Sequence, residues 1–171
     1  GKNGSDATSG AVRAARAFTN RDIILCCGYH GWQDWFIGTT SRSKGIPESV
    51  KNLTIPFPYN DIEFLERLLN KNKNNVAAII LEPMGITLPK NRFLEKVRDL
   101  ADEHKAILIF DECWTGFRIH QQGAYGKFKV SPDLSCFGKA LGNGVPISAI
   151  VGRASVLEML DKAFFSFTFG G

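Results

Sequence analysis

The stretch Ile107–Asp111 reads Ile-Leu-Ile-Phe-Asp, so four large apolar residues run directly into a carboxylate. A strand that is apolar at every position is typical of a parallel sheet that helices cover on both faces. Other runs of the same character are expected to form buried strands beside it: Ile23–Gly28, Val76–Glu82 and Leu134–Phe137. Ser148–Gly152 is expected to add one more short strand.

Amphipathic segments lie between these runs. Apolar residues at helical spacing predict helices over Ala7–Phe18, Asp61–Asn70, Asn91–His104 and Ala154–Ala163. Ser5 or Asp6 is expected to cap the first helix, and the polar stretch Trp32–Tyr59 is expected to be irregular. Strands that alternate with helices predict an α/β fold, with a three-layer, mostly parallel sheet and helices on both faces.

Composition narrows the class of protein. With 171 residues, 44% hydrophobic and 22% charged, the chain suits one globular domain. The net charge of +4 is spread out and forms no basic stripe, so we expect no nucleic-acid partner. No apolar run approaches a membrane span, and no membrane partner is expected. The four cysteines form no metal-binding spacing and are expected to be buried thiols in the cytoplasm.

Polar and aromatic residues follow the buried strands at their carboxyl ends. They are Tyr29 and His30, Glu82, Asp111 and Lys139. In open α/β sheets, ligands bind outside this edge. We therefore expect these side chains to surround a common site.

Each candidate residue has an ordinary alternative. Gly4-Ser5 at a helix start suits a phosphate, although Ser5 could simply cap the helix. Asp111 needs a cationic partner, which could be a protonated ring nitrogen of a ligand or Arg118. Tyr29 could stack on a ring or pack in the core. Lys139, with its stem in apolar surroundings, could act as a nucleophile towards carbonyls or be a solvated loop lysine. Taken together, these parts describe a site for pyridoxal 5′-phosphate.

Specific motifs strengthen this interpretation. The chain resembles class III aminotransferases, which are fold-type-I pyridoxal-phosphate enzymes, and within them the glutamate-1-semialdehyde 2,1-aminomutase group. The matching segments are Gly4–Ala7, Cys27–Gly31, Asp111–Arg118, Ser131–Leu134, Phe137–Gly144 and Thr168–Gly171. The resemblance implies that residues 1–171 are part of the large, cofactor-binding domain. It also implies that an amino-terminal segment and a carboxy-terminal small domain belong to the longer protein but not to this chain.

The resemblance also implies roles for individual residues. Lys139 would form the Schiff base with the cofactor, and Asp111 would keep its pyridine nitrogen protonated. Gly4 and Ser5 would bind the phosphate. Tyr29 would cover one face of the ring, with His30 beside it and Cys113 on the other face. Thr168 would reach the phosphate of a neighbouring subunit, which implies a homodimer.

Two loops depart from the aminomutase pattern. Met84–Pro89 and Trp32–Tyr59 are both shorter than their counterparts in that group. Both lie near the substrate, so an omega-amino acid or amino-sugar transaminase is an alternative activity. In each case an amino donor and a keto or aldehyde acceptor are the expected partners. A non-catalytic binding module of the same fold is the alternative from another class of function.

Overall fold

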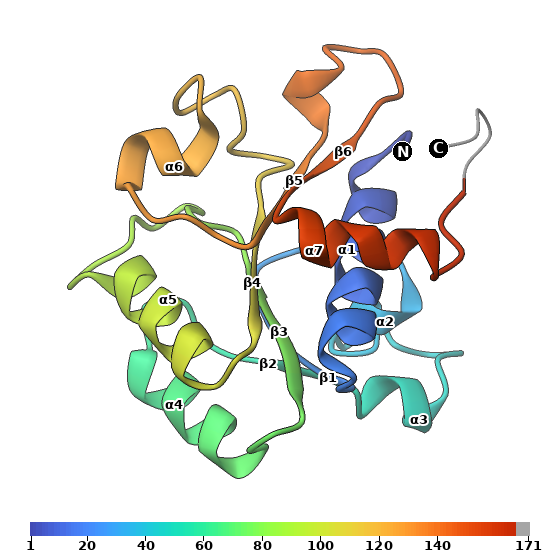
Figure 1. Ribbon diagram of the computed structural model, residues 1–171, viewed down its shortest axis with the longest axis vertical. Coiled ribbons are helices and arrows are strands. Elements are labelled where there is room, and N and C mark those ends of the chain that lie inside the picture. Colours follow the sequence, from blue (N-terminus) through green and yellow to red (C-terminus); the bar gives the residue numbers. More distant parts are fainter. Residues whose placement is uncertain (167–171) are drawn as a thin grey trace.

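A six-stranded sheet forms the centre of the protein in a computed structural model that describes residues 1–166 (Figure 1). The strand order is β2-β1-β3-β4-β5-β6. β1 to β5 are parallel, and β6 runs antiparallel to β5. The strands are β1 (Ile23–Cys27), β2 (Thr54–Pro56), β3 (Val76–Leu81), β4 (Ile107–Asp111), β5 (Leu134–Phe137) and β6 (Ala149–Gly152). The predicted α/β fold with a mostly parallel sheet is confirmed.

Helices cover both faces of the sheet. In Figure 1, α1, α2 and α7 lie on one side and α4, α5 and α6 on the other. The helices are α1 (Gly4–Thr19), α2 (Asp34–Ile37), α3 (Glu48–Lys51), α4 (Ile62–Lys71), α5 (Phe93–Glu103), α6 (Gly123–Phe128) and α7 (Ala154–Leu157). Within residues 1–166, none of them has the length and apolarity needed to cross a membrane.

Two hydrophobic cores result from the alternation of side chains along each strand. In β1, Leu25 and Cys27 belong to the core under α4 and α5. Ile24 and Cys26 belong to the core under α1. Neighbouring residues of a strand point to opposite faces, so a strand between two helical layers must be apolar throughout. The adjacent cysteines Cys26 and Cys27 therefore lie on opposite faces of the sheet.

The amino end of α1 differs from the prediction. The helix begins at Gly4, and its cap is Asn3, whose side-chain oxygen accepts the Asp6 N–H at 3.0 Å. Ser5 and Asp6, which were expected to cap the helix, lie in its first turn. The Ser5 hydroxyl therefore does not cap the helix and can form hydrogen bonds at the edge of the sheet. Near the other end of the helix, Phe18 is 36% exposed, and its ring lies 4.7 Å from the guanidinium of Arg153.

The stretch expected to be irregular is also more ordered than predicted. It contains α2, α3 and the edge strand β2, which pairs with β1 from Thr54 to Pro56. Periodicity is a weak signal for elements of three or four residues. Pro56 suits an edge strand because it has no N–H to donate to a neighbour. The last predicted helix is shorter than expected, since α7 ends at Leu157 and a 3₁₀ turn follows over Glu158–Asp161.

We predict that Ile109→Ala lowers the free energy of unfolding by about 2–5 kcal/mol, because it leaves a cavity in the central strand β4. Ile109 is fully buried in the core under α1. The matched control is Ile86→Ala, since Ile86 is fully exposed and should change stability by less than about 0.5 kcal/mol. Urea unfolding measures the change in the free energy of unfolding for both variants. Equal effects at the two positions would contradict the assigned core.

Candidate active site

A buried, hydrogen-bonded pair of side chains lies at the carboxyl edge of the sheet. Asp111, the last residue of β4, is 3% exposed, and its Oδ2 lies 2.8 Å from Nδ1 of His30, which is 1% exposed. Oδ1 of Asp111 accepts the backbone N–H of Cys113 at 3.0 Å. Arg118, the protein partner considered for Asp111, is exposed. The carboxylate therefore pairs within the protein with His30, a partner that sequence analysis did not consider.

His30 is held in one orientation by its surroundings. The ring stacks on Trp35 at 6.3 Å and meets the edge of Phe36 at 5.2 Å. Its backbone carbonyl accepts the hydroxyl of Thr8 at 2.7 Å. Because a carboxylate only accepts hydrogen bonds, Nδ1 carries the hydrogen. A carboxylate offers about four acceptor positions, so Asp111 retains capacity for a further donor.

The amino end of α1 adjoins this pair. A side chain on Gly4 would place its Cβ 2.7 Å from Sγ of Cys113, so only glycine allows the helix to approach that closely. The Ser5 hydroxyl accepts the backbone N–H of Trp32 at 3.3 Å. The first amides of an α-helix have no partner inside the helix, and they bind anions well. The amides of Gly4 and Ser5 thus offer hydrogen-bond donors beside Cys113, whose own N–H binds Asp111.

Lys139 lies next to the same helix end. A Cβ placed on the preceding residue, Gly138, would lie 3.5 Å from Sγ of Cys113 and from the backbone of Gly4. Lys139 opens a 3₁₀ turn, and its backbone φ of 39° is left-handed. This conformation costs a non-glycine residue about 1–2 kcal/mol, and such residues cluster at functional sites. Its side chain is exposed, whereas the sequence suggested a stem in apolar surroundings.

Tyr29 and Cys113 are close in the chain to the two members of the buried pair, since Tyr29 precedes His30 and Cys113 follows Asp111 by two residues. Tyr29 is 60% exposed, and its ring meets the edge of Phe36, with centroids 5.6 Å apart. It does not pack in the core. Cys113 is buried, and burial together with the charge of Asp111 raises the pKa of its thiol. Its sulfur is therefore a neutral, apolar surface.

Glu82 holds the turn that carries Tyr29. Its Oε2 accepts the backbone N–H of Tyr29 at 3.1 Å. The carboxylate also lies against Gly28, whose φ of 111° favours glycine. Sequence analysis placed Glu82 among the strand-end residues of the expected site but gave it no role there. The signal was present, since an acid that directly follows a buried strand needs a partner.

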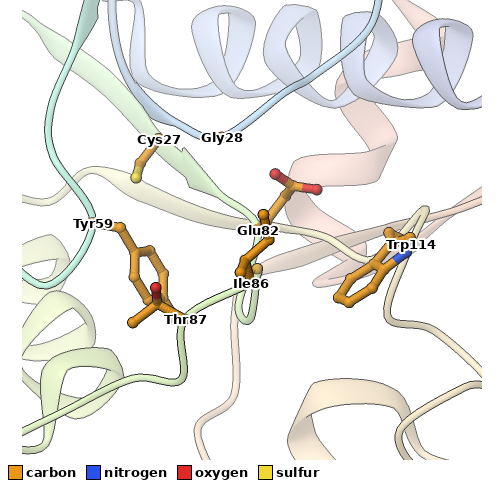
Figure 2. Close-up of a pocket in the computed structure, with 8 residues that line it drawn as sticks. Cys27, Gly28, Tyr59, Glu82, Ile86, Thr87 and Trp114 are labelled. Atoms are coloured by element: carbon orange, nitrogen blue, oxygen red, sulfur yellow. The ribbon is translucent and has the colours of Figure 1, made fainter.

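A pocket of about 430 Å³ adjoins the site on the side of Glu82 (Figure 2). Figure 2 shows Glu82 between Tyr59 and Thr87 on one side and Trp114 on the other. The lining residues are Cys27, Gly28, Tyr59, Glu82, Gly85, Ile86, Thr87 and Trp114. Burial, and to a smaller extent the charge of Glu82, raises the pKa of Cys27 to about 12. The pocket is thus largely apolar, with one acidic wall.

Glu112 is a second anchor that sequence analysis did not identify. It is buried, and its Oε2 accepts the Ala124 N–H at 2.7 Å and the Thr115 hydroxyl at 3.2 Å. Burial raises the pKa of this carboxyl, the charge of Asp111 adds to the rise, and the two hydrogen bonds oppose it. Glu112 ties back the loop that carries Cys113 and Trp114.

The structure gathers most of the predicted site at one edge of the sheet. Its members from the described residues are Gly4, Ser5, Tyr29, His30, Asp111, Cys113 and Lys139. Thr168, the remaining predicted member, lies outside the described residues. No group of three or more potential metal ligands occurs within residues 1–166. The arrangement combines an anion site, a flat ring, a buried carboxylate and a primary amine.

The family model described as "Aminotransferase class-III" matches residues 2–171. A 3-aminobutyryl-CoA aminotransferase from Cloacimonas acidaminovorans is 43% identical over 175 positions, which cover 98% of this chain and 42% of the relative. A glutamate-1-semialdehyde 2,1-aminomutase from Roseiflexus castenholzii is 44% identical over 175 positions, covering 94% of this chain and 40% of the relative. The chain thus spans about two fifths of the length of these curated relatives.

Solved structures share the fold. The internal aldimine form of the FumI protein from Sphingopyxis sp. MTA144, with pyridoxal phosphate (PLP), matches with a TM-score of 0.91 and 33% identity. The match covers 99% of this chain and 42% of that one. An omega-transaminase from Sphaerobacter thermophilus matches with a TM-score of 0.84 and 29% identity, covering 94% of this chain and 41% of that one.

We predict that His30→Phe lowers the free energy of unfolding by about 3 kcal/mol, because it leaves the Asp111 carboxylate buried without its partner. The double variant His30→Phe/Asp111→Asn should lose less free energy of unfolding than the two single variants lose together. The difference should exceed about 1 kcal/mol. Urea unfolding of the four proteins measures this coupling.

The exposed pair of Lys51 and Glu48 provides the control, with nitrogen and oxygen 2.7 Å apart. Lys51→Met should cost less than about 1 kcal/mol. If the effects of His30→Phe and Asp111→Asn on the free energy of unfolding were strictly additive, the two side chains would not stabilise each other.

Proposed function

Because the chain belongs to the class III aminotransferase family, we propose that the protein carrying it is a pyridoxal 5′-phosphate enzyme that transfers amino groups. One observation carries the proposal. The buried pair of Asp111 and His30 lies at the same sheet edge as Lys139 and the amino end of α1. A binding module would have no need of a buried carboxylate beside an exposed amine, which argues against the non-catalytic alternative.

The residues present fit this cofactor. The cradle of Gly4, Cys113 and Gly138 leaves no room for a side chain at Gly4 and so brings the first amides of α1 to the site, where they would bind the phosphate. Tyr29 would cover one face of the ring and the neutral sulfur of Cys113 the other. When bound, pyridoxal phosphate supplies a carbonyl that bonds to amines and a ring that accepts electrons.

Asp111 and Lys139 would act on different protons. Asp111, oriented by His30 and by the Cys113 N–H, would accept a hydrogen bond from the protonated ring nitrogen and keep it protonated. The Lys139 amine would hold the cofactor covalently and then move a proton to or from the substrate carbon. Glu82 would position Tyr29 through its backbone N–H.

The reaction we favour transfers the amino group from a donor to a separate keto or aldehyde acceptor. Support comes from the 3-aminobutyryl-CoA aminotransferase, which is 43% identical over an alignment that covers 98% of this chain. Amino migration within one molecule, as in an aminomutase, is the second candidate, because several aminomutases are 40–44% identical to the chain.

We predict that borohydride reduction of the holoenzyme attaches the cofactor to Lys139, because this amine lies beside the phosphate cradle. Peptide mapping by mass spectrometry identifies the labelled lysine. Lys139→Ala should lose the covalent bond and at least about 10³-fold in turnover. Lys127→Ala, which removes an exposed lysine from α6, should retain both.

Labelling at a lysine other than Lys139 would overturn the assignment. A second measurement separates the two reactions. A transaminase requires an added keto or aldehyde acceptor for continued turnover, whereas an aminomutase turns over without one. Turnover without an acceptor would therefore favour amino migration.

We further propose that the enzyme is a homodimer in the cytoplasm. The family resemblance at Thr168 and exposed apolar side chains such as Phe117, Val145 and Ile147 support the dimer. The four buried free thiols support a reducing compartment. Sedimentation of the holoenzyme at micromolar concentration should give twice the subunit mass, and a monomer would contradict the dimer. Cell fractionation should place the enzyme with cytoplasmic markers.

A further inference from the structure

The pocket beside Glu82 has the position of a substrate subsite. It opens at the ends of β1 and β3, and two of its lining residues are chain neighbours of site residues. Gly28 precedes Tyr29, and Trp114 follows Cys113. A substituent of an amine held near Lys139 would therefore find this pocket directly beside the ring-binding region. Its volume, about 430 Å³, is that of a small-molecule site.

The walls of the pocket are apolar and electronegative. Cys27, Tyr59, Ile86 and Trp114 contribute mainly carbon and sulfur surface, and Thr87 adds a neutral hydroxyl. No lysine, arginine or histidine lines it within the described part of the chain. Glu82 is the acidic group, and Figure 2 shows its carboxylate directed towards Gly28. Its charge adds to burial in raising the pKa of both Cys27 and Tyr59.

Binding an anionic substituent in this pocket would be unfavourable. The substituent would lose water to apolar walls and face the carboxylate of Glu82, with no lysine, arginine or histidine among the lining residues from the described part of the chain. An uncharged substituent avoids both costs and can still receive a hydrogen bond from Thr87. Like charges placed together disfavour a ligand strongly, so the discrimination should be large.

We propose that this pocket accepts the uncharged substituent of the amino donor and that Glu82 selects against a carboxylate there. The inference rests on the proposed function and deepens it by naming the substrate class. The donor is an amine whose chain carries an apolar group or a neutral carbonyl, such as an amide or ester, in place of a free acid.

Glu82 can be tested without dismantling the site. Glu82→Gln removes the charge but keeps a side-chain oxygen that can accept the Tyr29 N–H. Any change in selectivity then comes from charge, since the turn at Gly28 stays in place. Glu66→Gln is the matched control, because Glu66 is exposed on α4 and its loss changes the net charge equally.

The experiment compares 3-aminobutanoate with 3-aminobutanamide, which share a skeleton and differ in one negative charge. The holoenzyme is assayed for kcat/KM with each donor and with pyruvate as acceptor. In the wild type the amide should exceed the acid by about tenfold or more. Glu82→Gln should bring this ratio close to one by raising activity on the acid, and Glu66→Gln should keep the wild-type ratio.

Two failures can be told apart. Turnover with a wild-type ratio near one, or a ratio that Glu82→Gln leaves unchanged, would overturn the inference while leaving the enzyme assignment intact. If the cofactor is attached to Lys139 but the amide donor does not react, the inference alone fails. If borohydride attaches no cofactor to Lys139 of the wild type, the proposed function fails and the inference fails with it.

Discussion

The buried carboxylate of Asp111 is the constraint on which the rest of the site depends. An unpaired charge at the end of a fully buried strand would cost several kcal/mol, so the protein must bring it a partner. That partner, His30, comes from the loop after β1, two strands away in the sheet order. Trp35, Phe36 and Thr8 then hold the histidine, which links the long β1–β2 connection and α1 to the same charge.

Close approach between backbones is the second requirement. Gly4 and Gly138 meet around the sulfur of Cys113, so three segments far apart in the chain converge within a few ångströms. At the neighbouring strand, Gly28 turns against Glu82 and frees the Tyr29 amide to bind that carboxylate. Glu82 follows β3 and Glu112 follows β4, and each carboxylate fixes a loop. Both loops present an aromatic or apolar surface to the site.

Much of the fold could be predicted from the sequence because burial on both faces leaves a simple pattern. β4 and β5 have the predicted bounds, and the other long elements differ by a few residues at their ends. The errors fall where the pattern is short or local. Asn3 caps α1 instead of Ser5 or Asp6, and β2 is too short to show periodicity. Motifs placed Asp111 and Lys139 in one site, but no spacing could reveal the hydrogen bond from His30 to Asp111.

By itself, the sequence determined the α/β architecture and the edge at which polar groups collect. Strands that are apolar throughout must be covered on both faces, and the charged residues that follow them must lie at the edge of the sheet. Only the tertiary structure decided which groups touch. It paired Asp111 with His30 and not Arg118, exposed Lys139 on a left-handed turn, and made Glu82 both an anchor for Tyr29 and the acidic wall of a pocket. The hydrogen bonds of Asp111 with His30 and of Glu82 with Tyr29 join residues 81 and 53 positions apart, and they follow from strand order, which local sequence does not encode.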